Sequence, residues 1–330
     1  MKVTFETLIK KTGNMKTNFK VLYGALFMGA FLFSCSSSDD YTDRGLKKNQ
    51  NMVLNMPDQY KIIGEKHNEG LNYAFDELRI HYEQSQTRSN GKIRKLSKKS
   101  CLNLMEKACC QYCVENVDGY TNAYKAQTIS SVKTRSEALS IMSPEIAAFV
   151  DKIKSALKKD PKTSEQLLVR LNAINEEAAS VLSEADLAAV YAGTSTCYYS
   201  YIYWKENHMK WRLAVTNPKL LSHYTDEQLN AFVIKNGKLT LPSLTRGFWG
   251  DAWNGVTETW DSVTDSVSDW WDNGGEDVVG ADASGAVIGA ISGGTVGSAG
   301  AGVGAVPGAI VGGISGGASS SAGEIIEQLI

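Results

Sequence analysis

The chain has 330 residues, of which 43% are hydrophobic, and a formal net charge of −2, so it can bury a core and lacks the basic excess of a nucleic-acid-binding protein. We therefore expect no nucleic-acid partner. All 34 lysines and arginines lie before residue 247, whereas eleven of the 36 acidic residues follow it. This asymmetry predicts a domain boundary near residue 246.

The N-terminal residues have the order of a secretion signal. Lys16 and Lys20 precede the apolar stretch 21–33, which is too short to span a membrane easily. The sequence Leu-Phe-Ser-Cys at 32–35 places an apolar residue at minus three and a small residue at minus one. It resembles a lipobox, and this resemblance implies cleavage before Cys35 and lipidation of Cys35.

We accordingly expect 1–34 to be a signal peptide, with Met1 or Met15 as the true start, and 35–57 to be a lipidated tether. The Ser-Ser-Ser-Asp-Asp sequence at 36–40 resembles the export signal of Bacteroidetes lipoproteins. That resemblance implies a lipoprotein of the cell envelope, in the outer membrane and exposed at the surface. Membrane lipid is then the expected partner, since acyl groups suffice as an anchor.

Five further cysteines allow two interpretations. An odd number cannot pair completely within one chain, and the spacing does not fit a zinc site. We slightly favour small buried apolar residues over an interhelical disulfide to Cys197. The five are Cys101, Cys109, Cys110, Cys113 and Cys197.

The segment 58–246 is predicted to be an all-α, bundle-like domain that folds without the tail. Proline is sparse there, and apolar residues recur at spacings of three and four. A first helix has one face formed by His67, Leu71, Ala74, Leu78 and His81. A second helix is expected over 96–117.

Capping signals predict the later helices of this domain. Ser143-Pro144-Glu145 predicts a helix through Lys158, and Asp160-Pro161 repeats that start signal. The following helix has an apolar stripe formed by Leu167, Leu168, Leu171, Ile174, Ala178 and Val181.

Two more helices are expected before residue 246. Ser183 predicts the start of one that reaches about Met209. The sequence 225–228 forms a capping box for another, which Gly237 ends. Residues 238–246 are compatible with an extended segment.

No catalytic constellation is apparent, so we expect no enzyme, no cofactor and no metal site. The aromatic stretch 198–204 allows a sugar-binding platform, although helix packing is the commoner role of such residues.

An amphipathic helix rich in tryptophan is predicted within 247–275. Its apolar face suits a membrane interface, or equally a docked position on the basic body. The candidate membrane-interface residues are Trp249, Trp253, Trp260 and Trp270. A break is expected at 273–280.

Forty-one consecutive residues, 283–323, carry no charge and are rich in glycine. They predict a helical hairpin from 283–298 and 303–321, within a membrane-interacting region 276–330. Glycines at intervals of four form a stripe on each helix where backbones can approach closely. These zipper residues are Gly285, Gly289, Gly293, Gly297, Gly304, Gly308, Gly312 and Gly316. We expect leucine at Gly289 and Gly293 to disrupt this packing, and leucine at Ala290 to be tolerated.

The tail resembles glycine-zipper segments and is similar to the class II bacteriocins. Gly274-Gly275 also resembles a double-glycine processing site, which implies release of 276–330. The expected function is thus a non-enzymatic envelope lipoprotein whose tail inserts into, or forms homo-oligomers at, a membrane. The alternatives are an antagonistic toxin whose tail permeabilises a membrane, and a surface lipoprotein that binds ligands on its aromatic platform.

Overall fold

Helices form nearly all of the part of the chain that the computed structural model describes, so the fold class is all-α. The described residues are 53–88, 95–118, 120, 142–159, 161–230, 232–235, 238–240, 271–298 and 304–329. All of them belong to one compact unit, Met52–Ile330. The predicted signal peptide, Cys35 and the four candidate interface tryptophans lie outside the described residues.

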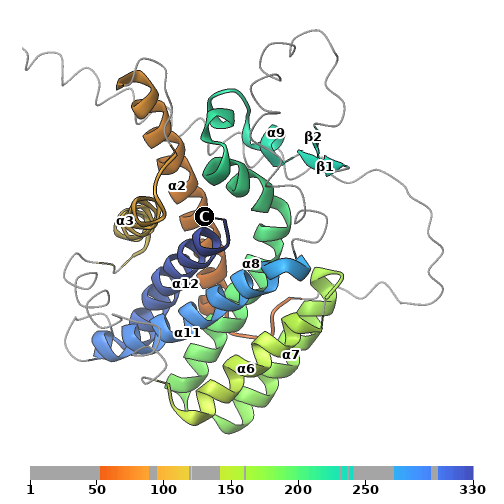
Figure 1. The fold of residues 1–330 in the computed structure, drawn as a ribbon. Coiled ribbons are helices and arrows are strands. Elements are labelled where there is room, and N and C mark those ends of the chain that lie inside the picture. Colours follow the sequence, from red (N-terminus) through yellow and green to blue (C-terminus); the bar gives the residue numbers. More distant parts are fainter. Residues whose placement is uncertain are drawn as a thin grey trace, which may run out of the picture. The chain divides into compact units, whose positions relative to one another are not determined.

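Within the described residues, the long helices of the body are five in number, and Figure 1 shows their arrangement. They are α2 (Asp58–Arg88), α3 (Lys98–Asn116), α6 (Pro144–Lys158), α7 (Ser164–Val181) and α8 (Glu184–Thr216). Helix α8 is the centre of the packing because it contacts α2, α6, α7 and both helices of the tail. The body ends in η1 (Pro218–Ser222), the short helix α9 (Asp226–Asn230) and a hairpin of strands β1 (Val233–Lys235) and β2 (Lys238–Thr240).

Side-chain caps fix where the body helices begin. Ser143 accepts a hydrogen bond from the amide of Ile146, and Pro144 occupies the first turn, as the sequence predicts. Ser183 caps α8 in the same way. Helix α7, however, begins at Ser164 and not at the predicted Asp160-Pro161 signal; its cap is Thr163, whose hydroxyl accepts a hydrogen bond from the Gln166 amide.

Three further predicted boundaries and two predicted core positions are also wrong. Helix α8 continues to Thr216, past the expected end near Met209, and the apolar residues of its last turns, from Trp211 to Val215, are buried. Helix α9 stops at Asn230, since the chain turns there into β1. No break occurs at 276–280, which is already helical. Val181 is 66% exposed, and on α2 the buried face passes from Leu78 to Tyr82, which leaves His81 exposed.

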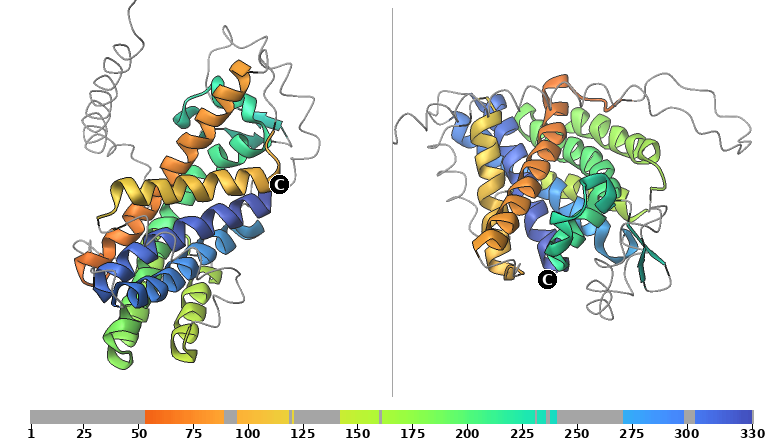
Figure 2. Two further views of the ribbon diagram at one scale, coloured as in Figure 1. Left: turned by 90° about the vertical axis from the view of Figure 1, so that its left-hand side faces the viewer. Right: turned by 90° about the horizontal axis from the view of Figure 1, so that it is seen from above.

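The tail forms a helical hairpin that packs into the body. After the π-helical turn η3 (Trp271–Gly275), α11 (Glu276–Ser298) and α12 (Ala305–Leu329) run side by side (Figure 2). Helix α11 contacts α6 and α8, and α12 contacts α2, α3 and α8. Val279, Val287 and Ile326 are completely buried in the same core as the body residues.

The hairpin therefore differs from the separate region expected after residue 246. Its apolar surface lies against the body helices, and one core contains residues of both. The charge asymmetry marked a change in composition, but hydrophobic burial joins the two parts. Within the described residues, no helix has both the length and the apolar character that crossing a membrane requires.

Candidate functional site

Four glycines of α11 are paired with Gly304, which precedes α12, and with three glycines of α12. Atoms of Gly316, Gly312 and Gly304 lie where a side chain on Gly285, Gly289 or Gly297 would need room, and a Cβ added to Gly308 would lie 2.3 Å from the Gly293 carbonyl oxygen. A methyl group added to Gly289 would lie 2.0 Å from the Gly312 carbonyl oxygen, and one added to Gly312 would lie 2.0 Å from that of Gly289. Real Cβ atoms are not found at such separations. The two backbones are therefore in direct contact.

This contact explains why the hairpin uses glycine despite its poor helix propensity. An interior glycine costs about 1 kcal/mol relative to alanine. Direct backbone contact provides dispersion energy and Cα–H to carbonyl interactions that side chains would prevent. Gly304 differs from the other seven because it precedes α12 and has a φ of +81°, so it also forms the turn that joins the helices.

A second glycine face, which the sequence analysis missed, joins the hairpin to the body. A Cβ on Gly317 would lie 2.9 Å from Cδ2 of His67 on α2, and one on Gly313 would lie 3.2 Å from Cβ of Ala192 on α8. On α8, a Cβ at Gly193 would lie 2.5 Å from Cγ2 of Val287. The double glycines at 312–313 and 316–317 were the available signal, since adjacent glycines serve two faces of one helix.

One buried carboxylate anchors the hairpin to the body. Asp282 of α11 is completely buried, and its Oδ2 accepts hydrogen bonds from Ser200 Oγ (2.5 Å) and Trp204 Nε1 (2.9 Å) of α8. His67 Nε2 of α2 lies 3.7 Å from the same oxygen and 3.0 Å from Ser321 Oγ of α12. Four helices thus meet at one polar cluster, which we call the Asp282 cluster.

The Asp282 cluster has the residue types of a catalytic triad but not the geometry. In a triad the acid and the serine bind opposite nitrogens of the imidazole. Here Ser321 and Asp282 both face Nε2 of His67, while Nδ1 lies 3.0 Å from Oδ1 of Asn68. All the side chains from the four helices are completely buried. No substrate can reach them, so the cluster joins helices.

Burial makes the charge of Asp282 costly. Desolvation raises the pKa of Asp282 above its ordinary value, and His67, Ser200, Ser321 and Trp204 oppose that effect only in part. Its Oδ1 has no hydrogen-bond partner among the described residues. An isolated acid beside the uncharged run 283–323 was the sequence signal for this anchor.

The aromatic stretch of α8 contributes mainly to the core. Tyr201, Tyr203 and Trp204 are at most 4% exposed, and only Tyr198 and Tyr199 are half-buried. Tyr203 accepts a hydrogen bond from Trp211 Nε1, and Trp204 belongs to the Asp282 cluster. Core packing thus uses the rings that a sugar-binding platform would need at the surface.

The five cysteines described are all buried and none of them forms a disulfide within the described residues, which agrees with the interpretation as small apolar residues. Burial raises the pKa of the Cys101 thiol to about 11 and that of Cys109 well above its usual range. Both are therefore held as unreactive thiols. Nowhere in the described ranges do three His, Cys, Asp or Glu residues form a group that could hold a metal ion.

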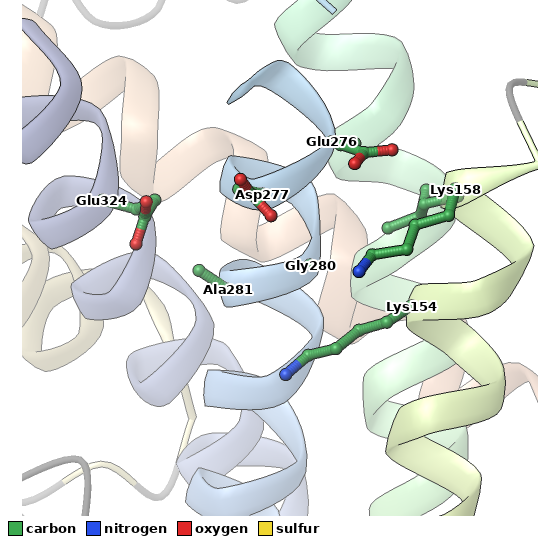
Figure 3. A pocket seen from close by; sticks show the side chains of 8 residues that line it. Lys154, Lys158, Glu276, Asp277, Gly280, Ala281 and Glu324 are labelled. Carbon is green, nitrogen blue, oxygen red and sulfur yellow. The ribbon is translucent and has the colours of Figure 1, made fainter. Parts of the chain in front are cut away.

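A pocket of about 340 Å³ lies where α6 meets the two tail helices (Figure 3). Lys154 and Lys158 extend from α6 towards α11, and Glu276 and Asp277 lie on the first turn of α11. Glu324 of α12 completes the charged lining, and Leu157, Gly280 and Ala281 form the rest of the wall.

Comparison with known proteins adds no functional assignment: no family model, no curated protein and no solved structure matches this chain.

Proposed function

We propose that the protein is a non-enzymatic lipoprotein of the cell envelope that carries a membrane-active glycine hairpin inside its folded body. The anchor would be an acylated Cys35 in the outer membrane, as the signal at 16–40 implies. The observation that supports this proposal most is the position of the hairpin. The helices with the longest uncharged run pack against α2, α3, α6 and α8, so the folded chain buries many of their apolar residues.

The contacts of the hairpin support the proposal that it can leave the body and act on a membrane. Glycine contacts close the hairpin on itself, and its contact with the body includes one buried carboxylate with an unpartnered oxygen. Charged buried groups weaken an interface compared with apolar residues of similar volume. The hairpin is therefore tightly closed internally, with a costly polar group at its contact with the body.

The lack of a suitable membrane-crossing helix in the described residues limits how the hairpin acts. Because its glycine faces are paired with each other, the hairpin would enter the membrane interface as one unit or associate with hairpins of other copies of this chain. The zipper residues are used within the chain here, so an oligomer through the same faces requires the hairpin to open.

The anchor is tested by Cys35→Ala. We expect this variant to remain an uncleaved precursor without fatty-acid label and to leave the outer-membrane fraction, whereas Cys197→Ala should mature normally. Normal maturation and labelling of Cys35→Ala would reject the lipoprotein assignment.

Membrane activity is tested by loosening the hairpin. Gly193→Leu drives a side chain between α8 and Val287 of α11, whereas Gly323→Leu places the same side chain where an added Cβ meets nothing within 4 Å. In dye-filled liposomes, we expect Gly193→Leu to release more dye than the mature chain, and Gly323→Leu to match it. Equal leakage from both variants would contradict a stored membrane-active hairpin.

A toxin is the second candidate, and one observation favours it. The potential cleavage point after Gly275 falls where α11 begins, so cleavage would release both tail helices intact. Gly274 has a φ of +120°, and its carbonyl accepts a hydrogen bond from Gln328 near the C-terminal end of α12. Mass spectrometry of the culture medium distinguishes this function, since only the toxin predicts a secreted peptide 276–330.

A further inference from the structure

The pocket between α6 and the tail helices has walls of opposite charge. The lysines at 154 and 158 are one helical turn apart on α6 and lie on the same wall. The carboxylates of Glu276, Asp277 and Glu324 come from α11 and α12. Both signs of charge thus border one cavity of about 340 Å³, within the usual size range of small-molecule sites.

These charges are not used in the packing of the described chain. Lys154, Lys158, Glu276 and Asp277 form no hydrogen bond and no ion pair with any other described residue. Lys152, two residues earlier on α6, differs because it pairs with Glu177. Within the described residues, the pocket therefore holds two ammonium groups and two carboxylates that have no hydrogen-bond or ion-pair partner.

The charge arrangement selects among ligand classes. A simple anion would be attracted by the lysines but repelled by three carboxylates, and a metal cation would meet two lysines. A small zwitterion satisfies both walls, because its acidic group faces Lys154 and Lys158 while its ammonium group faces the acids. Leu157 and Gly280 leave an apolar patch for a short carbon chain between the two ends.

We infer that this pocket binds a small zwitterion of the aminoethyl phosphate type, with a primary ammonium group and a phosphate separated by a short chain. The group occurs free and as the headgroup of phosphatidylethanolamine. The inference does not depend on the membrane activity proposed above, since it concerns only the charged pocket.

Calorimetric titration of the mature chain carrying Cys35→Ser with phosphoethanolamine tests the site. We expect binding that weakens at least tenfold in Lys154→Gln/Lys158→Gln and also in Glu276→Gln/Asp277→Asn, with Lys152→Gln as the matched control on α6. Inorganic phosphate should bind at least tenfold more weakly than phosphoethanolamine. Circular dichroism verifies that each variant keeps its helix content.

The outcomes separate the possibilities. Absence of binding to the parent chain, or binding to either double variant as tight as binding to the parent chain, overturns the site. Equal binding of inorganic phosphate, with no effect of the acidic-wall variant, also overturns it and indicates a simple anion site. Sedimentation with phosphatidylethanolamine vesicles, compared with phosphatidylcholine vesicles, then identifies the source: preference for the former supports the lipid headgroup, and no preference supports the free zwitterion.

Discussion

The body and the hairpin are packed in opposite ways. Around α8, the largest fully buried side chains are Trp204 and Trp211, and aromatic rings fill the space between helices. Along the hairpin, backbone contacts backbone directly at four glycine pairs. The body is therefore sensitive to lost volume, whereas the hairpin is sensitive to added volume. A sequence that appears simple in the tail is as strictly constrained as the aromatic core.

The largest expected effect comes from removing the hairpin. A 41–246 chain loses the apolar surfaces that cover α2 and α8, so we expect no cooperative melt by circular dichroism, only residual helix. The full mature chain is the control. A melt as cooperative as that of the full chain would support the prediction from the sequence that 58–246 folds without the tail.

A cavity in the body should give the second-largest loss in the free energy of unfolding. Leu171 is completely buried on α7, and we expect Leu171→Ala to lower the free energy of unfolding by about 2–5 kcal/mol in urea titrations. Val169→Ala on the same helix is the control, because Val169 is 55% exposed. Similar losses for the two would mean that α7 is not part of the core.

In the hairpin, an added methyl group should lower the free energy of unfolding at a glycine contact and raise it where space is open. Gly289→Ala places a methyl group against the Gly312 carbonyl and should cost about 1–3 kcal/mol, despite the higher helix propensity of alanine. Gly323→Ala fills open space and should stabilise α12 by up to about 1 kcal/mol. If urea titrations give both variants the same sign, the glycine contact is not tight. Ala290, expected from its spacing to tolerate leucine, is only 2% exposed and is not a suitable control.

The Asp282 cluster should give the smallest effect and one that depends on pH. Because burial raises the folded-state pKa of Asp282, the folded chain binds this proton more tightly than the unfolded chain does. Its unfavourable contribution is therefore absent below the unfolded value of 3.8 and grows as pH rises through the folded pKa. Asp282→Asn lacks this titration. Unfolding free energies at pH 4 to 7 should show the parent chain losing stability relative to the variant as pH rises; a constant difference would contradict the raised pKa.

The sequence predicted most of the body helices because local signals determine them. Ser143-Pro144 and Ser183 mark helix starts that the structure confirms, and the stripe from Leu167 to Ala178 is buried. These signals failed where a tertiary contact decides the outcome. Helix α8 runs past Met209 because neighbouring helices bury its last turns, and local sequence does not contain that information.

The amino-acid sequence by itself determined the all-α class, the capped helix starts and a pair of glycine-rich helices, since propensity, caps and periodicity act over a few residues. Only the tertiary structure decided where the glycine faces lie. Gly313, Gly317 and Gly193 fit the hairpin to the body, and Asp282 meets His67 and Ser200 across sequence separations that no local pattern spans. Hydrophobic burial placed the tail inside the body, because covering an uncharged hairpin lowers the free energy more than leaving it in water.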